Sequence, residues 1–235
     1  MSVEGPSPIA ESPIGELFLH PTLDAKRLAL PAGAVLMDAE QPADNLYYIQ
    51  QGQVRTYQPG PEAEDRLIDI LGPGDWCGAS ALGHVPHYLA SAIVVVPSVI
   101  YQVCAQRLLS LLPQHPGAAE ELIRTLVHKL HAAHEEAARL VFDDCHVRLL
   151  KTLVRFSGTA AATMQADGTG GVVLRITHQQ LAQAVGVARE TISLALTHLR
   201  QQNLLRTGRN QLFFDPEVLR SFAVAGQVRD VPQVA

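Results

Sequence analysis

Apolar and polar positions along the chain change their spacing twice. From about Leu28 to Cys104, short apolar runs of the kind that form β-strands are separated by glycines, a pattern typical of an all-β barrel or jelly roll. Within this part, residues 44–55 predict a strand, a turn at Gly52 and a second strand. After residue 116 the spacing becomes helical, and beyond residue 142 short helical and strand patterns alternate.

The long helix is predicted over residues 118–142, a stretch with neither glycine nor proline. Its apolar residues follow one another at steps of 3, 4, 3, 4 and 3, the spacing of a coiled-coil seam. Such a stripe could also pack on the all-β part of the same chain. The strict spacing favours a second copy of the helix, and hence a homodimer. The predicted seam consists of Ile123, Leu126, Leu130, Ala133, Ala137 and Leu140.

The part beyond the long helix begins with an acidic pair, Asp143 and Asp144, at which we place a hinge. An amphipathic helix is then predicted over residues 147–156. Residues 159–171 are rich in Ala, Thr and Gly and predict a surface loop, which leads into a strand over residues 172–176.

Two short helical patterns joined at Gly186 are the most informative feature of the chain. Thr177 and Gln180 are spaced as a capping box, so the first helix is predicted over residues 178–185. Gly186 suits the left-handed backbone that ends such a helix, and a second helix follows. The pair has the form of a helix-turn-helix.

The second helix has one apolar face, which packs, and one polar face, which carries Arg189, Glu190 and Ser193. In a helix-turn-helix, residues at the start of the second helix reach base edges in the major groove of DNA. Arginine suits guanine there, and a carboxylate accepts from cytosine. Residues 203–214 then predict a β-hairpin with a basic tip, so that Arg206 and Arg209 would contact phosphates from a wing.

Helix pairs joined by a glycine also occur in proteins that never contact DNA, and the charge distribution helps to decide between the two interpretations. Residues 172–214 hold five arginines and one acid, a net charge of +4. The whole chain has a net charge of -5, so the remainder carries -9. A basic segment on an acidic carrier is typical of a DNA-binding module.

Composition and motifs exclude several classes of protein. The N-terminus lacks a basic start followed by an apolar run, and the longest apolar stretch ends at Pro97, so neither a signal peptide nor a membrane span is expected and the cytoplasm is the expected location. Cys77, Cys104 and Cys145 form no paired motif and are expected to be buried thiols, with a redox-sensing Cys145 as the alternative. No phosphate-binding loop, nucleophile elbow or catalytic metal motif indicates an enzyme.

Over residues 17–222 the chain resembles the Crp-Fnr family of bacterial transcription regulators. The resemblance is carried by Leu-Tyr-Tyr-Ile-x-x-Gly-x-Val at residues 46–54 and by Arg-Glu-Thr at residues 189–191. It implies an α+β fold with an N-terminal β-roll sensor domain over residues 1–117, a dimerisation helix over residues 118–142 and a winged helix-turn-helix over residues 143–235.

The resemblance also implies how the chain would contact DNA and the transcription machinery. Arg189, Glu190 and Ser193 match positions that contact bases, and Thr177, His178 and Gln179 match positions that contact phosphates. A palindrome with TGTGA-like half-sites is expected for a homodimer. The loop at residues 159–171 resembles one that contacts RNA polymerase. A transcription activator is the leading expectation, although the sequence does not decide between activation and repression. Leu194 departs from the family, which places an arginine there.

The effector pocket departs further. Cyclic-AMP binders of the family have a Gly-Glu-Leu turn and an Arg-Ser-Ala triplet, in which Glu holds the ribose and Arg the cyclic phosphate. This chain has Gly78-Ala79-Ser80 and Ala90-Ser91-Ala92 instead, and His134 follows Ala133 where the family offers a hydroxyl to the adenine. Each lost charge-assisted contact costs about 1.5–3 kcal/mol. Cyclic AMP is therefore not expected as a ligand.

Two alternatives remain for the β-roll: it holds the dimer permanently competent for DNA, or it binds an unidentified effector other than a nucleotide, such as haem or a fatty or aromatic acid. Histidines offer haem or metal ligation as a hypothesis. On a helix, however, each step of three residues turns the side chain by about 60°, so a single chain cannot bring the first and last of the helical histidines to one ion. We therefore expect no resident cofactor or metal. These histidines are His84, His87, His128, His131 and His134.

Overall fold

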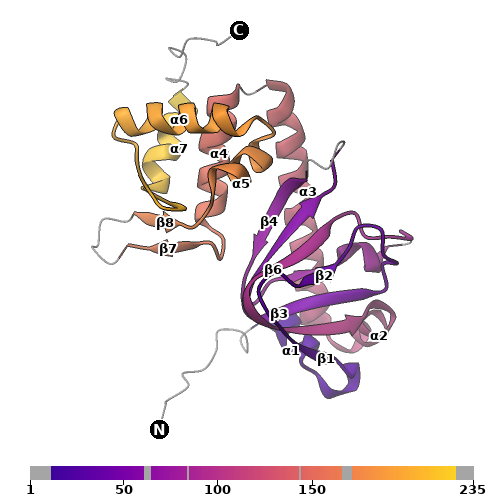
Figure 1. Cartoon of the computed structure of the whole chain (residues 1–235). Helices are drawn as coiled ribbons and strands as arrows, with labels where there is room; N and C mark the ends of the chain where they lie inside the picture. Colours follow the sequence, from indigo (N-terminus) through magenta and orange to yellow (C-terminus); the bar gives the residue numbers. More distant parts are fainter. Residues whose placement is uncertain (1–11, 61–64, 84, 143, 166–170, 226–235) are drawn as a thin grey trace. The chain divides into compact units, whose positions relative to one another are not determined.

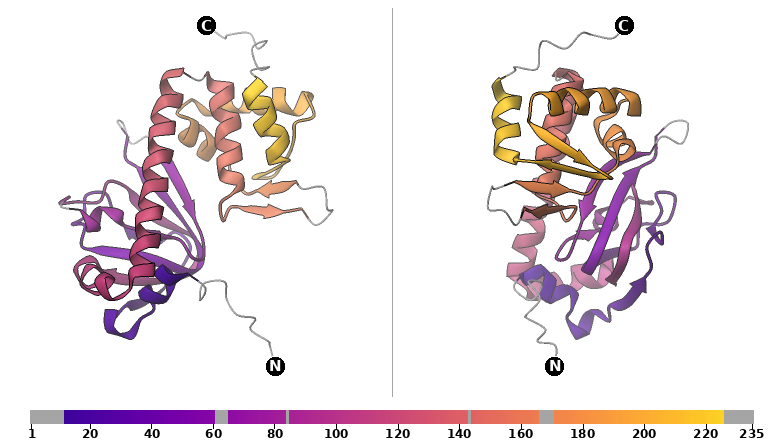
Figure 2. Two further views of the ribbon diagram at one scale, coloured as in Figure 1. Left: turned by 180° about the vertical axis from the view of Figure 1, so that it is seen from behind. Right: turned by 60° about the vertical axis from the view of Figure 1, so that its left-hand side comes forward.

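The structure is a computed structural model of the chain, and it describes residues 12–60, 65–83, 85–142, 144–165 and 171–225. Side chains are described in these ranges except at residues 139–142 and 224–225. The chain divides into two compact units. The first comprises residues 1–63 and 68–133, and the second comprises residues 64–67 and 134–235. Both are drawn in Figure 1 and Figure 2, and each is described by itself.

The first unit is built on a six-stranded antiparallel sheet with the order β1-β6-β3-β4, in which β2 also pairs with β6 and β5 with β3. Two short helices precede or follow the strands, together with short 3-10 turns. The elements are α1 (Pro13–Phe18), η2 (Pro21–Leu23), β1 (Lys26–Leu30), β2 (Val35–Met37), β3 (Asn45–Gln58), β4 (Arg66–Leu71), β5 (Trp76–Cys77), η4 (Ala79–Leu82), β6 (Ser91–Cys104), α2 (Ala105–Leu111) and η5 (Leu112–Gln114).

The turn predicted at Gly52 is wrong, because residues 45–58 form one continuous strand, β3. Gly52 has a φ of +104° and lies where the register between β3 and β6 shifts. A Cβ at Gly52 would lie 2.7 Å from the backbone Cα of Ser98, so a glycine is needed. The extra residues are absorbed as bulges that bend the strand, and a bend of this kind has the same local sequence signal as a turn.

Apolar side chains fill both faces of this sheet. One cluster, which includes Tyr47, Ile49 and Val54 of β3, fills the interior of the roll. The other cluster joins the opposite face of the sheet to α1, α2 and the start of α3 (Pro116–Phe142) through residues such as Leu46 and Tyr48. The long helix predicted over residues 118–142 is thus confirmed, and its first turns are part of the core of the first unit.

The second unit combines a four-stranded sheet of order β7-β8-β10-β9 with several helices (Figure 1). Asp144 caps α4 by accepting a hydrogen bond from the backbone N–H of Val147 at 2.9 Å. The elements are α4 (Cys145–Ser157), β7 (Ala162–Met164), β8 (Val172–Leu174), α5 (His178–Val185), α6 (Arg189–Gln201), β9 (Leu205–Gly208), β10 (Gln211–Phe214) and α7 (Pro216–Ala225).

The prediction of a surface loop over residues 159–171 is wrong in part. Residues 162–164 form the strand β7, which pairs antiparallel with β8 so that Ala162 faces Leu174 across the ladder. Residues 166–170 lie outside the described residues. A three-residue edge strand has too short a pattern to be separated from a polar loop by alternation alone.

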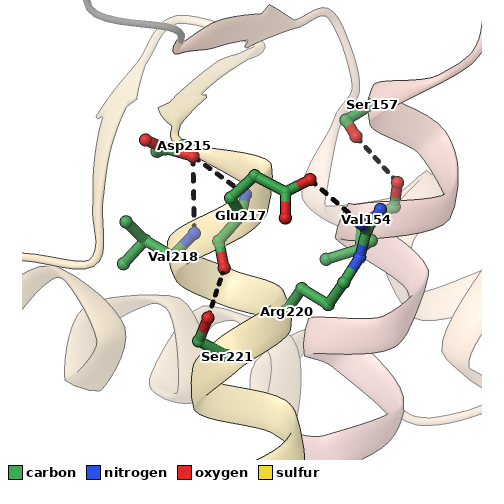
Figure 3. A network of polar contacts seen from close by, with 7 residues as sticks. All are labelled: Val154, Ser157, Asp215, Glu217, Val218, Arg220 and Ser221. Atoms are coloured by element: carbon green, nitrogen blue, oxygen red, sulfur yellow. Dashed lines mark hydrogen bonds and ion pairs between the residues drawn. The ribbon is translucent and has the colours of Figure 1, made fainter.

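The last helix, α7, is fixed by its own polar contacts and by packing against α4. Asp215 accepts from the backbone N–H groups of Glu217 and Val218 at 2.8 and 3.4 Å, and Glu217 pairs with Arg220 at 2.9 Å (Figure 3). These contacts satisfy the first N–H groups of the helix. The helix-turn-helix is therefore part of a small domain whose last helix is capped and packed against α4.

Candidate DNA-binding surface

Local hydrogen bonds fix the turn between α5 and α6. Thr177 Oγ1 accepts from Gln180 N at 3.2 Å, and Gln180 Oε1 accepts from Thr177 N at 3.0 Å, which is the predicted capping box. Gly186 adopts a φ of +75° and closes α5 by donating to Ala182 O at 2.8 Å. The capping bond uses a lone pair of the Thr177 hydroxyl and leaves its proton available for another acceptor.

The recognition helix α6 separates its residues into two faces. Ile192, Ala195, Leu196 and Leu199 are buried in the core of the second unit. Arg189 and Glu190 are exposed in the first turn, and no ion pair among the described residues engages either side chain. Their charges are therefore available to a partner outside the chain.

A polar contact links the recognition helix to the start of α5. Ser193 Oγ donates to Arg189 O at 3.0 Å and lies 3.0 Å from His178 Nδ1. Because the hydroxyl has one proton, the ring must be the donor in the second contact. Ser193, which was predicted to contact a base, is half-buried and keeps only an accepting lone pair for that task.

The predicted wing is present as β9 and β10, joined by Arg209 and Asn210, with Asn210 in the left-handed region at a φ of +55°. Arg206 and Arg209 are both exposed. The Arg206 guanidinium lies over the Phe213 ring at 5.8 Å, which orients it along the hairpin.

A cavity of about 440 Å³ lies between the start of α5, the start of α6 and the wing. Five of the predicted DNA contacts line it, together with Ile176, Gly208, Asn210, Gln211 and Leu212. The ten lining residues include two arginines and no carboxylate. The predicted residues among them are Thr177, His178, Gln179, Arg189 and Arg209.

The other predicted contacts lie near this cavity without lining it. Glu190 follows Arg189 on α6, Ser193 bonds to His178, and Arg206 lies on β9. Sequence reasoning missed Asn210 and Gln211, which line the cavity through the hairpin. The sequence did contain a signal for Asn210 and Gln211, because they directly follow Arg209 at the tip of the predicted hairpin.

Comparison with known proteins identifies the family to which the chain belongs. Residues 27–115 match the cyclic nucleotide-binding domain family, and residues 147–222 match the Crp-like helix-turn-helix domain family. The CRP-like cAMP-activated global transcriptional regulator of Mycobacterium tuberculosis is 29% identical over 195 residues, which are 80% of this chain and 84% of that protein. The chain belongs to the Crp-Fnr family.

Other relatives and solved structures agree with this assignment. The cAMP-activated global transcriptional regulator CRP of Escherichia coli O157:H7 is 24% identical over 74% of this chain and 82% of its own length. A CRP/FNR-family regulator from Thermus thermophilus matches with a TM-score of 0.67 and 25% identity, over 85% of this chain and 98% of its own. The c-di-GMP-responsive regulator CLP of Xanthomonas campestris has the same fold, with a TM-score of 0.72 and 22% identity over 86% of this chain and 98% of its own.

For a Crp-Fnr protein the exposed side of the long helix is of special interest. Leu122 is buried in the first unit and Leu126 packs partly against its core, whereas Ile123, Val127 and Leu130 are exposed at 61%, 47% and 54%. Ala133 and Ala137 are exposed as well, and the side chain of Leu140 lies outside the described residues. Val127 was missed, although it lies four residues after Ile123 and three before Leu130 and so shares their side of the helix.

The opposite side of α3 contacts the β-roll of its own chain. Lys129 Nζ lies 5.9 Å from the Trp76 ring centroid and 3.7 Å from a carboxylate oxygen of Asp69. Glu121 accepts from Ser12 Oγ at 2.7 Å and from Ile14 N at 2.9 Å. The interpretation that the stripe packs on the β-roll therefore holds in part, because Leu126 packs partly against the core of the first unit. The dimer seam stays a prediction.

The segments predicted as a degenerate effector pocket are joined to each other and to the roll. Gly78 precedes η4, which holds Ala79 and Ser80, and Ser80 Oγ accepts from Leu89 N at 3.3 Å, just before Ala90. Ser91 Oγ accepts from Ala39 N at 3.1 Å, and Ala92 is fully buried. His134, also predicted for this pocket, is exposed on α3. In this chain, residues 78–80 and 90–92 thus carry small side chains without charge.

Aromatic side chains occupy the interior of the roll beside these segments. The Tyr88 ring is buried and its hydroxyl both donates to Asn45 O at 2.8 Å and accepts from Asn45 N at 3.0 Å. Tyr47 lies 6.4 Å from it between ring centroids, and burial raises the pKa of Tyr47. Burial also raises the pKa of the Cys77 thiol to about 12, so this group stays neutral. Beside this apolar cluster one charged side chain of β3 is also buried, that of Arg55 with 6% of its surface exposed, and it has an interaction within the chain.

The other candidate chemistry finds no support in the part of the chain that is described. Among those residues no three His, Cys, Asp or Glu side chains come together in a way that could hold a metal ion, and His84 lies outside them. Burial raises the pKa of Cys145, with a smaller opposing effect from Arg148, so its thiol is less reactive than a free one. No helix among the described residues has the length and apolarity to cross a bilayer.

Proposed function

We propose that the protein is a homodimeric transcription activator that binds a palindromic DNA site with TGTGA-like half-sites and does not depend on cyclic AMP. The carrying observation is the cavity of about 440 Å³ between α5, α6 and the wing, lined by Arg189 and Arg209 with no carboxylate. A phosphate oxygen fits beside Arg209 of the wing because it accepts hydrogen bonds and carries the opposite charge. Arg189 and Glu190 then contact base edges from the exposed face of α6.

Dimerisation is supported by the free side of α3. A stripe of Ile123, Val127 and Leu130, all about half exposed or more, is costly to leave in water along a rod. A second copy of the same helix covers it through a self-complementary contact. Two recognition helices then read two half-sites about one helical turn of DNA apart, which is why the site is palindromic.

Independence from cyclic AMP is supported by the chemistry of the β-roll. A cyclic phosphate carries a negative charge that needs a counter-charge when it is buried. The segments at residues 78–80 and 90–92 supply none. Among the described residues of the roll the buried charged side chain is Arg55 of β3, which already has an interaction within the chain. Several relatives are named as cAMP-activated. In this chain, the roll either keeps the dimer competent for DNA without a ligand or takes an effector of another kind.

The remaining parts of the proposal follow from the same organisation. The protein acts in the cytoplasm, with a β-roll domain over residues 1–117, a dimerisation helix over residues 118–142 and a DNA-binding domain over residues 143–235. RNA polymerase is the further partner, contacted through residues 159–171, where β7 forms an edge strand.

The test is a binding titration with purified full-length protein and no added nucleotide. Fluorescence anisotropy is recorded with a labelled duplex that carries two TGTGA-like half-sites and with a duplex of shuffled sequence. The proposal predicts binding to the palindrome about a thousandfold tighter than to the shuffled duplex, with a stoichiometry of two chains per duplex. Equal affinity for the two duplexes would refute sequence-specific recognition, and binding only after addition of cyclic AMP would refute independence.

A further inference from the structure

Leu194 stands on the exposed face of the recognition helix with 64% of its surface accessible. It lies four residues after Glu190 and three before Thr197, so the three side chains share one side of α6. Single exposed leucines are common at protein surfaces. This one, however, lies one turn beyond the base-reading pair, on the face that enters the major groove under the proposed function.

The two hydroxyl groups nearest to Leu194 on α6 donate their protons to the helix backbone. Ser193 Oγ donates to Arg189 O at 3.0 Å, and Thr197 Oγ1 donates to Ser193 O at 2.9 Å. Both hydroxyl protons are thus used by carbonyls of the helix itself. The second turn of α6 consequently presents the leucine side chain without a neighbouring hydroxyl that is free to donate.

A leucine carries neither donor nor acceptor, so it cannot pair with the polar edges of guanine, cytosine or adenine. In the major groove the apolar group that distinguishes a base is the C5-methyl of thymine. A polar base edge placed against Leu194 would lose its water without gaining a hydrogen bond. A thymine methyl placed there removes two apolar surfaces from water.

We propose that Leu194 selects thymine in each half-site through contact with its C5-methyl group. The proposal rests on the proposed function. Four residues of helix rise about 6 Å, which corresponds to about two steps of the DNA helix. The selected thymine therefore lies within about two base pairs of the pair that Glu190 contacts.

The experiment removes single methyl groups from the DNA. A preferred palindrome is first selected from random duplexes by the full-length protein. Each thymine of the half-site is then replaced symmetrically by deoxyuridine, which lacks the methyl and keeps the hydrogen-bonding edge. Wild-type protein is expected to bind about fourfold more weakly per half-site at one position, or about fifteenfold for the symmetric change.

The substitution Leu194→Ala connects that position to the side chain. In this variant, replacement of the same thymine by deoxyuridine should change affinity by less than about twofold, whereas the other positions keep their wild-type response. Val218→Ala is the matched control, because Val218 is an exposed apolar residue on α7, which packs against α4. The control should keep the full response at every position.

A second variant tests whether a change at residue 194 can change the preferred base. Leu194→Arg places donors on the same face and should change the preferred base at that position from thymine to guanine. If wild-type protein selects no palindrome, the proposed function fails. If it selects one, but every deoxyuridine effect persists in Leu194→Ala, the assignment of Leu194 is overturned while the proposed function stands.

Discussion

The two units of the chain treat charged side chains in opposite ways. The helix-turn-helix unit exposes Arg189, Glu190 and Arg209 around a concave surface, without ion pairs to them among the described residues. The β-roll places small uncharged side chains at residues 78–80 and 90–92 and fills its interior with apolar groups. Residues 27–115 match the cyclic nucleotide-binding domain family and residues 147–222 match the Crp-like helix-turn-helix domain family. The comparison shows that a family's chemistry has to be tested in each unit separately. The second unit keeps the charged side chains expected to contact DNA, whereas residues 78–80 and 90–92 of the first lack the charges of the family's cyclic-AMP binders.

The largest loss of DNA affinity is expected from a substitution on α3, the helix through which we propose that two chains form the dimer. Leu130→Glu places a charge in the proposed seam, and two such charges face each other in the dimer. We expect monomers and a loss of specific binding to the level of random DNA, about a thousandfold or more, since one half-site provides too few contacts. Analytical ultracentrifugation and anisotropy measure the two effects.

Val218→Glu introduces the same charge at an exposed apolar site on α7 and is expected to leave the dimer intact. A Leu130→Glu protein that remains dimeric would contradict the proposed seam.

The next effect tests the β-roll directly. Ala79→Glu together with Ala90→Arg restores the two charged side chains that the family's cyclic-AMP binders carry. We expect the double variant to bind cyclic AMP about a hundredfold or more tightly than the wild type, because each charge-assisted contact contributes about 1.5–3 kcal/mol. Isothermal titration calorimetry measures both proteins.

Ala79→Gln with Ala90→Met is the matched control, since it adds similar volume without charge. Tight binding of cyclic AMP by the wild-type protein would remove the contrast between the units. An equal gain in the uncharged control would show that volume, and not charge, was missing.

A smaller effect concerns the pH dependence of the DNA-binding unit. Burial lowers the pKa of His146 from its ordinary value of 6.5; Asp144 opposes this, and His198, whose ring lies 6.3 Å away between centroids, adds to it. The unfolded chain then binds a proton more readily than the folded one. Stability is therefore fully present above pH 6.5 and is lost as the pH falls through the lowered pKa of the folded state.

Thermal unfolding measured between about pH 7.5 and about pH 5 should show this loss in the wild type, and His146→Gln should reduce it. His131→Gln, on the exposed side of α3, is the control and should leave the pH dependence unchanged. An identical slope in wild type and His146→Gln would show that this imidazole does not control it.

Much of the fold was predictable from the sequence because many elements are set by residues close together in the chain. The DNA-binding unit is an example. The capping box at Thr177, the left-handed Gly186 and the hairpin are local signals, and the structure confirms the bounds of α5 at residues 178–185. The bulge at Gly52 and the short strand β7 depend on partners far along the chain, Ser98 and β8. Local patterns cannot distinguish a bulge from a turn, or a short edge strand from a loop.

The candidate site shows the same limit. Charge and spacing predicted which residues of α6 face outward, and α6 exposes Arg189 and Glu190 but half-buries Ser193. The bond between His178 and Ser193, and the concave arrangement of α5 and the wing, needed coordinates because they join segments through space. On α3, periodicity alone assigned Leu126 to the seam, whereas it packs partly on the β-roll and Val127 is exposed.

The most direct test of the central claim compares two arginines of the same cavity. Arg189→Ala should weaken binding to the palindrome by about 1–3 kcal/mol per contact and change binding to shuffled DNA little, because Arg189 is assigned to a base edge. Arg209→Ala should weaken both duplexes alike and reduce the salt slope by about one per subunit, because Arg209 is assigned to a phosphate. A selective loss of palindrome binding for Arg189 alone is the predicted result, and equal losses on both duplexes for the Arg189 variant would contradict the account.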